Sequence, residues 1–590
     1  MIECTRCVKN RCVRIPSLPP PICPPPTRIP FPWRYVLPWI LFFGTMGAVI
    51  DNDKQSTTLH YKLRPTVVPG RPRLKNRRPF YATDLPTCVQ YLIIGGGTAA
   101  WSAYNSIMEN HPTAKVFFIT IEDCLPYERP PLTKHMWWNK EPPNIDNLNY
   151  VDDGVLKTMY YTTCKNFIDP IKFYRKEIGP AASIAQGWRV LRVDPEEHAV
   201  YIETLCGEQP IFYERCLIAT GSRPKNLNVF KTASKGVKEK ITTLSTIRDL
   251  EIAFRKARAA KHVTIIGGGN LGSELAWSLG KMNQKTKENN PLAETPEVVH
   301  VIKDKGILPG ILPEYLGEWA VEKIKVEGAK VITKNEVVDA FKTEDDRLNL
   351  TLSDGSSLIT DYVFVAVGSE ARTEIGEKSN LEIDEVNGGM IVNTELEARK
   401  HLFVAGDAAS VYTEWKDTRM RFQHYANALE TGEIAGANMA GAWVAANLEP
   451  HFWFTLGEDL NVEVSVIGEA GACLQTVGIF KQCADDPAPA PKLVNIEASG
   501  DKPCYKKTPE YKNRYKRGMI FYLRDEFVVG VTFWNIPPVD DRTGAVIEML
   551  RARPTYKDIN MLAELLGFPQ TQCTYAKQIE ELEEPDCFTK

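Results

Sequence analysis

The sequence predicts an α/β protein that combines two Rossmann-like dinucleotide-binding domains with an α+β C-terminal domain. Three observations lead to this fold class. An apolar run enters a glycine-rich turn at Tyr91-Leu-Ile-Ile-Gly95-Gly-Gly97-Thr-Ala-Ala100, and a second copy follows at Val263-Thr-Ile-Ile-Gly267-Gly-Gly269-Asn-Leu-Gly272. Beyond residue 450, short strand-like runs recur at 462–468, 476–480, 519–523 and 527–534.

Each glycine turn has the spacing that cradles a pyrophosphate between a strand and a helix. The first glycine permits the tight turn, the second lets the backbone approach the phosphates, and the third small residue packs the helix on the strand. One such turn is weak evidence. Two turns, each followed by a second strand and an acid, predict two dinucleotides in one chain. Because two bound dinucleotides most naturally exchange a hydride, the sequence predicts a redox flavoprotein.

The composition is that of an ordinary globular protein of about three domains. The chain has 590 residues, of which 43% are hydrophobic and 25% charged, and its net charge is −3. That charge argues against a surface built for nucleic acid. The 14 cysteines are dispersed rather than arranged as a disulfide scaffold. Cys4, Cys7, Cys12 and Cys23 could ligate a metal, but no histidine or second Cys-x-x-Cys accompanies them, so no metal site is predicted.

Residues 1–84 differ from the rest of the chain. Residues 1–34 are rich in proline and basic residues, 35–50 are uncharged, and 51–84 form a linker that contains the basic stretch 71–78. This layout predicts a mitochondrial targeting segment with a possible inner-membrane anchor at 35–50, and a secretory signal is the rival. As a helix the uncharged run is about 24 Å long, short of the ~30 Å hydrocarbon core. The basic stretch is either a solvated tether or a nucleic-acid contact.

The first dinucleotide domain is predicted at 85–225 and 370–449, and its first half carries two candidate acids and two candidate cations. A helix from Trp101 leads to a strand at 116–121 that ends in Glu122 and Asp123, where an acid can bind a ribose diol; a capping role suits Asp123 better. Prolines stiffen the following loop and hold Arg129 and Lys134. Lys134 either stabilises charge on a reduced flavin or forms an exposed salt bridge.

Two small-residue turns mark the rest of this domain. The strand that ends at Ala219-Thr220-Gly221 predicts the crossover between the two dinucleotide domains, because a larger side chain would clash with the cofactor. Asp407 follows a later strand, 401–405, and suits the ribityl hydroxyls of a flavin. Small residues and then a helix are expected after it.

The second dinucleotide domain is predicted at 226–369. A long helix to about residue 290 precedes a strand at 298–302 and then Asp304, and an acid there favours NADH over NADPH. Lys303 and Lys305 flank this acid, so NADPH stays open. Glu274, in the first turn of the long helix, either complements the helix dipole or points at the nicotinamide and Lys134.

The chain lacks two devices that relay electrons away from a flavin. The helix after the first glycine turn, 101–110, has no Cys-x4-Cys, and no Rieske-type Cys-x-His pair occurs. Electrons are therefore expected to leave the flavin directly.

Five motifs together resemble the mitochondrial apoptosis-inducing factor family over about 85–565. They are Gly-Gly-Gly97-Thr98-Ala99-Ala, Leu-Pro-Tyr127-x-Arg129-Pro-Pro-Leu-x-Lys134, Gly-Gly-Gly269-x-Leu271-Gly-Ser-Glu274-Leu, Ile-Leu-Pro-Glu314-Tyr-Leu and Gly518-Met-Ile-Phe-Tyr-Leu-Arg524-Asp. The resemblance implies a glutathione-reductase-like fold and an FAD-containing NADH oxidoreductase of the intermembrane space, tethered to the inner membrane. It also implies support of respiratory-chain biogenesis through a disulfide-relay import partner, a redox-linked homodimer, and promotion of cell death on release to the nucleus.

By motif position, the resemblance implies the following site residues. FAD contacts are expected at Gly95, Gly97, Thr98, Ala99, Glu122, Asp123, Arg129, Lys134, Val190, Lys225, Asp407, His424, Tyr425 and Trp453. NAD contacts are expected at Gly268, Gly269, Asn270, Leu271, Glu274, Asp304, Gly368, Glu463 and Asn535. The expected catalytic residues are Lys134, Glu274, His424 and Trp453, with Lys134 and Glu274 paired at the reactive edge of the flavin.

This sequence departs from the family pattern at four places. Asn270 replaces an aromatic residue that gates the nicotinamide, Tyr425 a histidine, Gly310 a lysine of the NAD loop, and Lys225 an FAD-contacting arginine. Losing a bidentate guanidinium or a ring stack weakens a contact by ~1 kcal/mol. We therefore expect FAD to be retained, and NADH affinity, the rate of reduction and the lifetime of a charge-transfer complex to change.

The C-terminal domain, 450–590, contains a Pro-, Asp- and Lys-rich stretch at about 484–516 that predicts a flexible loop. Three functions remain open. The first is an NADH:FAD oxidoreductase whose charge-transfer form is a redox switch that reshapes this loop and the oligomeric state. The second is a protein that mainly binds an import partner or DNA, with little NADH turnover. The third is a quinone- or ferredoxin-directed reductase.

Overall fold

The computed structural model describes residues 77–481, except 139–142, 145–146, 153, 174–178, 415 and 457–461, together with 515, 517–536, 542–567 and 573–578. The predicted targeting segment, the uncharged run at 35–50, the cysteines at 4–23 and nearly all of loop 484–516 lie outside these residues. Within the described residues, no helix combines the length and apolar character that a membrane crossing requires.

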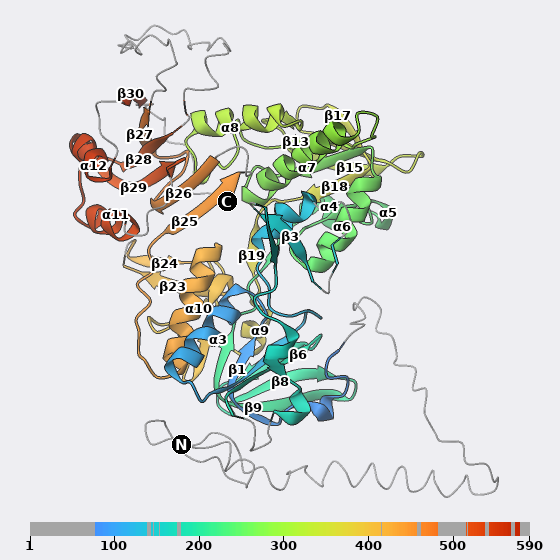
Figure 1. The fold of residues 1–590 in the computed structure, drawn as a ribbon, viewed down its shortest axis with the longest axis vertical. Coiled ribbons are helices and arrows are strands. Elements are labelled where there is room, and N and C mark those ends of the chain that lie inside the picture. The colour runs from blue at the N-terminus through green and yellow to red at the C-terminus, as the bar shows by residue number, and fades with distance from the viewer. Residues whose placement is uncertain are drawn as a thin grey trace, which may run out of the picture.

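A nine-stranded sheet forms the part of the molecule that carries the first glycine turn (Figure 1). The order of its main path is β21-β22-β9-β1-β2-β6-β5, and β7 and β8 extend it from β9. Strands β1, β2, β5, β6, β9 and β22 pair in parallel, and their runs are largely buried, as parallel strands covered on both faces must be. The bounds are β1 Cys88–Ile94, β2 Lys115–Thr120, β5 Phe167–Ile168, β6 Ala181–Gln186, β7 Val190–Asp194, β8 Ala199–Thr204, β9 Gly207–Ile218, β21 Glu397–Arg399 and β22 Leu402–Val404.

Helices α3 (Thr98–Asn110) and α10 (Tyr425–Met439) pack tightly on each other beside this sheet (Figure 1). Small residues allow the close approach. A Cβ on Gly432 of α10 would lie 2.4 Å from the carbonyl oxygen of Ala99 in α3. The helix that begins at the first glycine turn is therefore fixed against a segment more than 300 residues away in the chain.

A second, five-stranded parallel sheet carries the second glycine turn, in the order β11-β18-β12-β13-β14. Helix α6 beside it begins with a capping box between Thr246 and Asp249, and α7 begins directly after Gly269. A small antiparallel sheet, β15-β16-β17, completes this part. The bounds are β11 Ile241–Thr242, β12 His262–Ile266, β13 Glu297–Val301, β14 Lys330–Ile332, β15 Val337–Lys342, β16 Leu348–Leu352, β17 Ser357–Thr360, β18 Tyr362–Val365, α4 Asn228–Thr232, α5 Lys235–Lys238, α6 Ile247–Ala259, α7 Asn270–Asn289 and α8 Glu314–Val326.

The C-terminal part is a six-stranded antiparallel sheet in the order β25-β26-β29-β28-β27-β30, with α11 and α12 near one end (Figure 1). Its four predicted strands are all present. The bounds are β25 His451–Leu456, β26 Val462–Gly468, β27 Gln475–Lys481, β28 Gly518–Arg524, β29 Phe527–Trp534, β30 Cys573–Gln578, α11 Arg542–Arg551 and α12 Ile559–Leu565. Strand β25 faces the other two parts and brings Trp453 and Thr455 toward them.

Short elements connect the three parts. Strand β10 (Ser222–Pro224) pairs with the distant strand β19 (Ser369–Ala371), and β3 (Asn149–Asp152) forms a local hairpin with β4 (Val155–Thr158). The proline-stiffened loop forms two 3-10 turns, Pro130–Thr133 and His135–Trp138, with Lys134 between them. The remaining elements are β20 Met390–Ile391, β23 Ala409–Thr413, β24 Thr418–Met420 and α9 Glu374–Lys378.

One predicted element was wrong. The helix expected after Asp407 and its small residues does not follow them; a single 3-10 turn, Gly406–Ala408, leads instead into strand β23. The run Ala409-Ser-Val-Tyr-Thr413 contains β-branched and aromatic residues that favour a strand. The helix of this region, α10, begins later at Tyr425, and the imidazole of His424 caps it.

Candidate active site

The first glycine turn is shaped by one close approach, at Gly95. Gly95 has φ +133°, and a Cβ there would lie 2.2 Å from the carbonyl oxygen of Ala219, at the predicted crossover. Gly97 precedes α3, and a Cβ on it would meet the guanidinium of Arg129 at 3.9 Å. The turn therefore requires glycine at position 95, and it leads into α3, whose first N–H groups are the kind that bind a pyrophosphate.

Glu122, the acid that follows β2, lies in a hydrogen-bond network with neighbouring side chains. Glu122 accepts hydrogen bonds from the hydroxyl of Tyr127 at 2.8 Å and from Arg129 at 3.1 Å. Arg129 also donates to the carbonyl oxygen of Ser245 at 2.6 Å. The neighbouring Asp123 is instead ion-paired with Arg248 of α6. Each oxygen of Glu122 therefore already accepts one hydrogen bond, and Asp123 pairs with a residue of α6 where the two dinucleotide parts meet.

Asp407 is half-buried, follows the end of strand β22 and lies beside Ser222. The Ser222 hydroxyl donates to its Oδ2 at 2.6 Å. Burial raises the pKa of Asp407, while Ser222, Arg421 and Arg129 oppose that shift. A carboxylate in this setting gains from further hydroxyl donors, such as those of a ribityl chain.

The second glycine turn repeats the geometry of the first. Gly267 has φ +119°, and its Cβ would lie 2.2 Å from the carbonyl oxygen of Ala366. A Cβ on Gly272 would lie 2.1 Å from the carbonyl oxygen of Gly267. His300, on the buried strand β13, holds the turn through its Nε2, 2.8 Å from that same oxygen. Burial lowers the pKa of His300 to about 4, so the ring is neutral and Nε2–H is the donor.

The first residue of α7 carries an unused acceptor. The side-chain oxygen of Asn270 is buried and has no hydrogen-bond partner among the described residues. Gly268, Gly269 and Leu271 surround it in sequence, and Asp304 lies exposed beyond β13. An orphaned acceptor next to a glycine cradle fits a dinucleotide that supplies the missing donor. These residues fit NAD(H), as the residues of the first turn fit FAD.

An ion pair joins the two dinucleotide parts. The Lys134 Nζ lies 3.2 Å from the Glu274 Oε1, and both side chains are nearly buried, at 12% and 11% exposure. The Thr133 hydroxyl donates to the other oxygen of Glu274 at 2.6 Å, and Lys134 Nζ donates to the Thr455 hydroxyl at 3.3 Å. Three segments of the chain therefore fix this lysine in place. The exposed salt bridge weighed for Lys134 is wrong, because the pair is buried.

His424 acts as a structural clamp between α10 and β25. Its Nδ1 accepts from the backbone N–H of Ala426 at 3.2 Å, so its Nε2–H donates to the carbonyl oxygen of Trp453 at 2.7 Å. Burial lowers the pKa of His424 to about 4, and the ring is neutral at pH 7. The Trp453 indole, 42% exposed, meets His424 and Tyr425 edge to face. This arrangement presents an open aromatic surface to a bound ligand.

The other predicted residues differ in position. Glu463 lies opposite Thr455 on β26, and its N–H donates to the side chain of Asn535 at 2.8 Å, so the structure brings these two together. The N–H of Lys225 donates to the carbonyl oxygen of Gly368 at 2.9 Å. The side chain of Val190 packs in the core of the first sheet, which leaves its backbone for any cofactor contact.

The structure adds residues that the sequence did not reveal. Thr133, Thr455 and Ser222 hold predicted charged groups, and His300 holds the second turn. Tyr161 is hydrogen-bonded to Thr98 at 2.9 Å and stacks on Trp101. Most of these partners lie more than 100 residues apart, so no local pattern marks them; Thr133 alone stood next to a predicted residue. The described residues hold no cluster of three metal-ligating side chains.

Comparisons with protein families and with related sequences agree with one another. Residues 89–432 match the pyridine nucleotide-disulphide oxidoreductase family, and 435–540 match the C-terminal domain of mitochondrion-associated apoptosis-inducing factor. A Drosophila melanogaster protein named putative apoptosis-inducing factor 1, mitochondrial, is 34% identical over 82% of this chain, which spans 66% of the fly protein. The Dictyostelium discoideum apoptosis-inducing factor 1, mitochondrial, is 32% identical, with 82% of each chain covered.

Solved structures share the fold at low identity. The putidaredoxin reductase of a covalent complex with putidaredoxin matches with a TM-score of 0.59 and 17% identity, over 79% of this chain and 93% of that one. The water-forming NADH oxidase of Lactobacillus brevis, bound to NADH, matches with a TM-score of 0.59 and 15% identity, over 80% of this chain and 93% of that one. The chain belongs to the apoptosis-inducing factor family and is an FAD-dependent NAD(P)H oxidoreductase that uses FAD and NAD(H).

Proposed function

We propose that this protein is an NADH-dependent flavoprotein of the mitochondrial intermembrane space whose reduced, charge-transfer form acts as a redox switch. The observation that carries the proposal is the buried Lys134–Glu274 pair, which lies where the two dinucleotide parts meet. When bound, the flavin supplies the hydride-accepting ring for the nicotinamide. The remaining roles belong to the chain.

Lys134 holds a fixed positive charge at the meeting point of the two cofactor sites, and Glu274 and Thr455 orient it. A charge held without water competition stabilises negative charge that develops nearby. Neutral His424 cannot donate a proton from an imidazolium at pH 7; it positions Trp453, whose exposed ring packs against the bound rings. Gly95, Gly97 and Asp407 bind FAD, and Gly268, Gly269 and Asn270 bind NAD(H).

NADH is the preferred reductant. Asp304 is exposed after β13, where an acid suits a ribose 2′-hydroxyl, and a 2′-phosphate would need free cations. Both flanking lysines are ion-paired: Lys303 with Glu336 at 2.8 Å and Lys305 with Glu314 at 2.5 Å. These pairs support NADH over NADPH.

The cellular role follows the family resemblance and the names of the relatives. The two relatives above are named as mitochondrial apoptosis-inducing factors. We assign residues 1–84 to mitochondrial targeting, an inner-membrane anchor at about 35–50 and a linker, 85–225 with 370–449 to FAD, 226–369 to NAD, and 450–590 to the C-terminal domain. Its reduced form would be a homodimer that binds a disulfide-relay import partner, and the released protein would promote cell death.

The test is an anaerobic titration of the purified chain with NADH and, separately, NADPH, followed by flavin absorbance and by size-exclusion chromatography. Bleaching with a new long-wavelength band, together with a change in size, is the expected result. An oxidised spectrum that millimolar NADH leaves unchanged would overturn the redox switch and favour a protein that binds a partner or DNA with little turnover.

A second candidate is electron transfer to a ferredoxin or quinone. One structural neighbour was solved with its ferredoxin partner, and a relative in Photorhabdus laumondii, 21% identical, is named as a ferredoxin–NAD+ reductase component. Steady-state assays with cytochrome c coupled through a ferredoxin, and with a short-chain quinone, separate this activity from the switch. Turnover with either acceptor at more than 10 times the rate with oxygen alone would favour it.

A further inference from the structure

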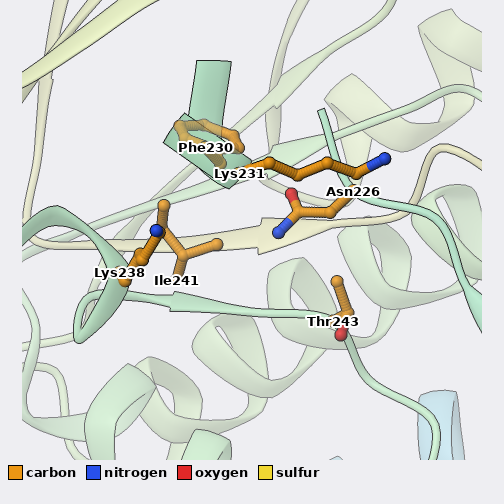
Figure 2. A pocket seen from close by; sticks show the side chains of 6 residues that line it. All are labelled: Asn226, Phe230, Lys231, Lys238, Ile241 and Thr243. Carbon is orange, nitrogen blue, oxygen red and sulfur yellow. The ribbon is translucent and has the colours of Figure 1, made fainter. Parts of the chain in front are cut away.

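A small pocket outside the cofactor sites is a poor candidate for a ligand site. Its volume is about 170 Å³, and it is lined by Asn226, Phe230, Lys231, Lys238, Ile241 and Thr243 (Figure 2). The ammonium groups of Lys231 and Lys238 lie on opposite sides of it, so one small anion cannot contact both. The exposed surface offers a stronger feature, a tryptophan that follows helix α10.

The side chain and the backbone of Trp443 are both unfavourable for the fold. The residue follows α10, which packs beside α3 at the left of Figure 1. Its φ is +60°, a conformation that a bulky residue rarely adopts, and its side chain is 80% exposed. Asparagine or glycine would suit this position better, because both adopt a positive φ readily and neither exposes a large apolar surface. An exposed residue that the fold does not favour points to a contact outside the fold.

The loop that carries Trp443 is held in one conformation. Helix α10 ends in a Schellman motif at Gly441, whose φ is +98°. The side chain of Asn438 then closes the loop on Val444: it donates to the carbonyl oxygen at 2.7 Å and accepts from the N–H at 2.6 Å. Trp443 therefore lies on a loop that is already ordered before any partner binds.

This loop is apolar, uncharged and satisfied in its own backbone. The run from Ile434 to Leu448 has no charged residue, and the side chain of Val444 is 42% exposed beside Trp443. Six N–H groups of the loop donate to oxygens of this chain, those of Ala440, Gly441, Ala442, Val444, Ala446 and Asn447. A bilayer surface suits such a loop, because apolar side chains leave water and few backbone groups lose a partner. A peptide that pairs with the backbone would need those groups free.

We propose that the loop 441–445 is a membrane contact that orients the protein on a phospholipid bilayer, with the Trp443 ring at the level of the headgroups. The inference rests on the anchor proposed above at about 35–50. The 26 residues 51–76 span at most ~90 Å, which lets the protein turn this loop toward the bilayer. Because one tryptophan and one valine bind lipid weakly, the tether is needed to raise their effective concentration at the surface.

The experiment follows backbone amide exchange at 440–447 in the FAD-loaded full chain on phosphatidylcholine vesicles. An added N-terminal hexahistidine tag and a nickel-chelating lipid hold the chain at the bilayer whether or not 35–50 spans it. Flotation with vesicles that lack this lipid tests the anchor separately, so failure of the anchor and failure of the loop contact are distinguishable. We expect exchange of the loop to slow at least fivefold on the vesicles. Cardiolipin or half-molar salt should change this slowing less than twofold, because the contact is apolar.

Variants assign the contact to the tryptophan. Trp443→Asn removes the ring and suits the positive φ, so it should keep or raise the thermal midpoint and lose the slowing. Trp443→Tyr keeps an aromatic ring with a polar tip and should retain at least half of the slowing. Leu292→Ser removes a side chain that is 92% exposed in the NAD part, and this matched control should leave the slowing unchanged.

Three results would overturn the proposal. Unchanged exchange on the vesicles would show that the loop does not meet lipid even when the chain is held there. Slowing that grows with protein concentration in the absence of vesicles would assign Trp443 to a contact with a second copy of the chain. Equal slowing in wild type and Trp443→Asn, or a lower thermal midpoint for this variant, would show that Trp443 is not the lipid contact or that it supports the fold.

Discussion

The two glycine turns of this chain share their backbone geometry and differ at the first residue of the following helix. A Cβ on Gly95 or on Gly267 would lie 2.2 Å from a carbonyl oxygen of a neighbouring strand end. After the first turn, Thr98 is hydrogen-bonded to Tyr161 at 2.9 Å. After the second turn, the Asn270 oxygen has no partner in the part of the chain that the structure describes.

This difference indicates how each half holds its dinucleotide. The FAD half satisfies its own polar groups at Thr98, Glu122 and Asp407, so the site is formed before the cofactor enters. The NAD half leaves the Asn270 acceptor beside its glycine turn open, and a bound molecule can satisfy and release it. The first arrangement suits a retained cofactor and the second suits an exchanged cosubstrate.

The largest expected effect tests the shared geometry. Gly95→Ala places a methyl group against the Ala219 carbonyl at a positive φ, so we expect the purified protein to keep less than about a tenth of its FAD. Gly267→Ala makes the same clash in the other half and should keep FAD but lose reduction by NADH. Absorbance at 450 nm relative to 280 nm measures FAD content, and anaerobic mixing measures reduction.

A third glycine provides the control for this pair. No atom lies within 4 Å of a Cβ on Gly269, and its φ is −77°, so Gly269→Ala should retain both FAD and the folded structure. FAD lost from Gly267→Ala but kept by Gly95→Ala would reverse the assignment of the two turns.

The next effect concerns the pair that joins the halves. Glu274→Gln leaves Lys134 nearly buried without its counter-charge, so we expect the free energy of unfolding to fall by about 3 kcal/mol. The rate of flavin reduction should fall at least tenfold. Lys134→Met in the same background should restore part of the stability but none of the rate. Urea unfolding and stopped-flow absorbance measure the two.

An exposed pair in the same half gives the matched comparison. Lys305 and Glu314 are about half exposed, and Lys305→Met should cost less than about 1 kcal/mol. If Glu274→Gln cost no more than this control, the buried pair would contribute nothing beyond an ordinary surface contact.

Particular residues show what the sequence could and could not predict. Both glycine turns and the Lys134–Glu274 pair followed from residues within short, recognisable motifs. Thr455 and Ser222 could not be found in this way, because each meets its charged partner only when segments 321 and 185 residues apart fold together. The helix expected after Asp407 failed for a local reason: β-branched and aromatic residues follow it and form β23.

The second glycine turn should have a pH dependence that the first glycine turn lacks. His300 on β13 pairs with Ile265, two residues before Gly267; the equivalent pair in the FAD half is Phe118 with Ile93. Burial lowers the pKa of His300 to about 4. The native state then binds fewer protons than the unfolded state between about pH 6.5 and 4, so stability falls as the pH falls through that window.

We expect His300 to account for about 2 kcal/mol of stability lost between pH 7 and pH 5. His300→Phe introduces the residue type found at the equivalent position of the FAD half, Phe118. The variant should lose the His300 contribution to the pH dependence of stability. It should keep the contributions of His424 and His198, whose pKa values are also lowered to about 4. Urea unfolding of both proteins at the two pH values measures the difference. An equal loss in wild type and variant would mean that His300 does not titrate in this range.

The smallest effect addresses the difference between the turns directly. Thr98→Val removes a hydrogen bond that the ligand-free protein makes, so it should lower the free energy of unfolding by about 1 kcal/mol. Asn270→Ala removes an acceptor that the ligand-free protein leaves unused, so its stability should stay the same or rise slightly. The affinity for NAD+, measured by calorimetry, should instead fall about fivefold. A variant that loses stability identifies a residue that supports the fold, and a variant that loses only NAD+ affinity identifies a residue that binds the ligand. If Asn270→Ala lost as much stability as Thr98→Val, the first helix residue would have the same structural role after both turns.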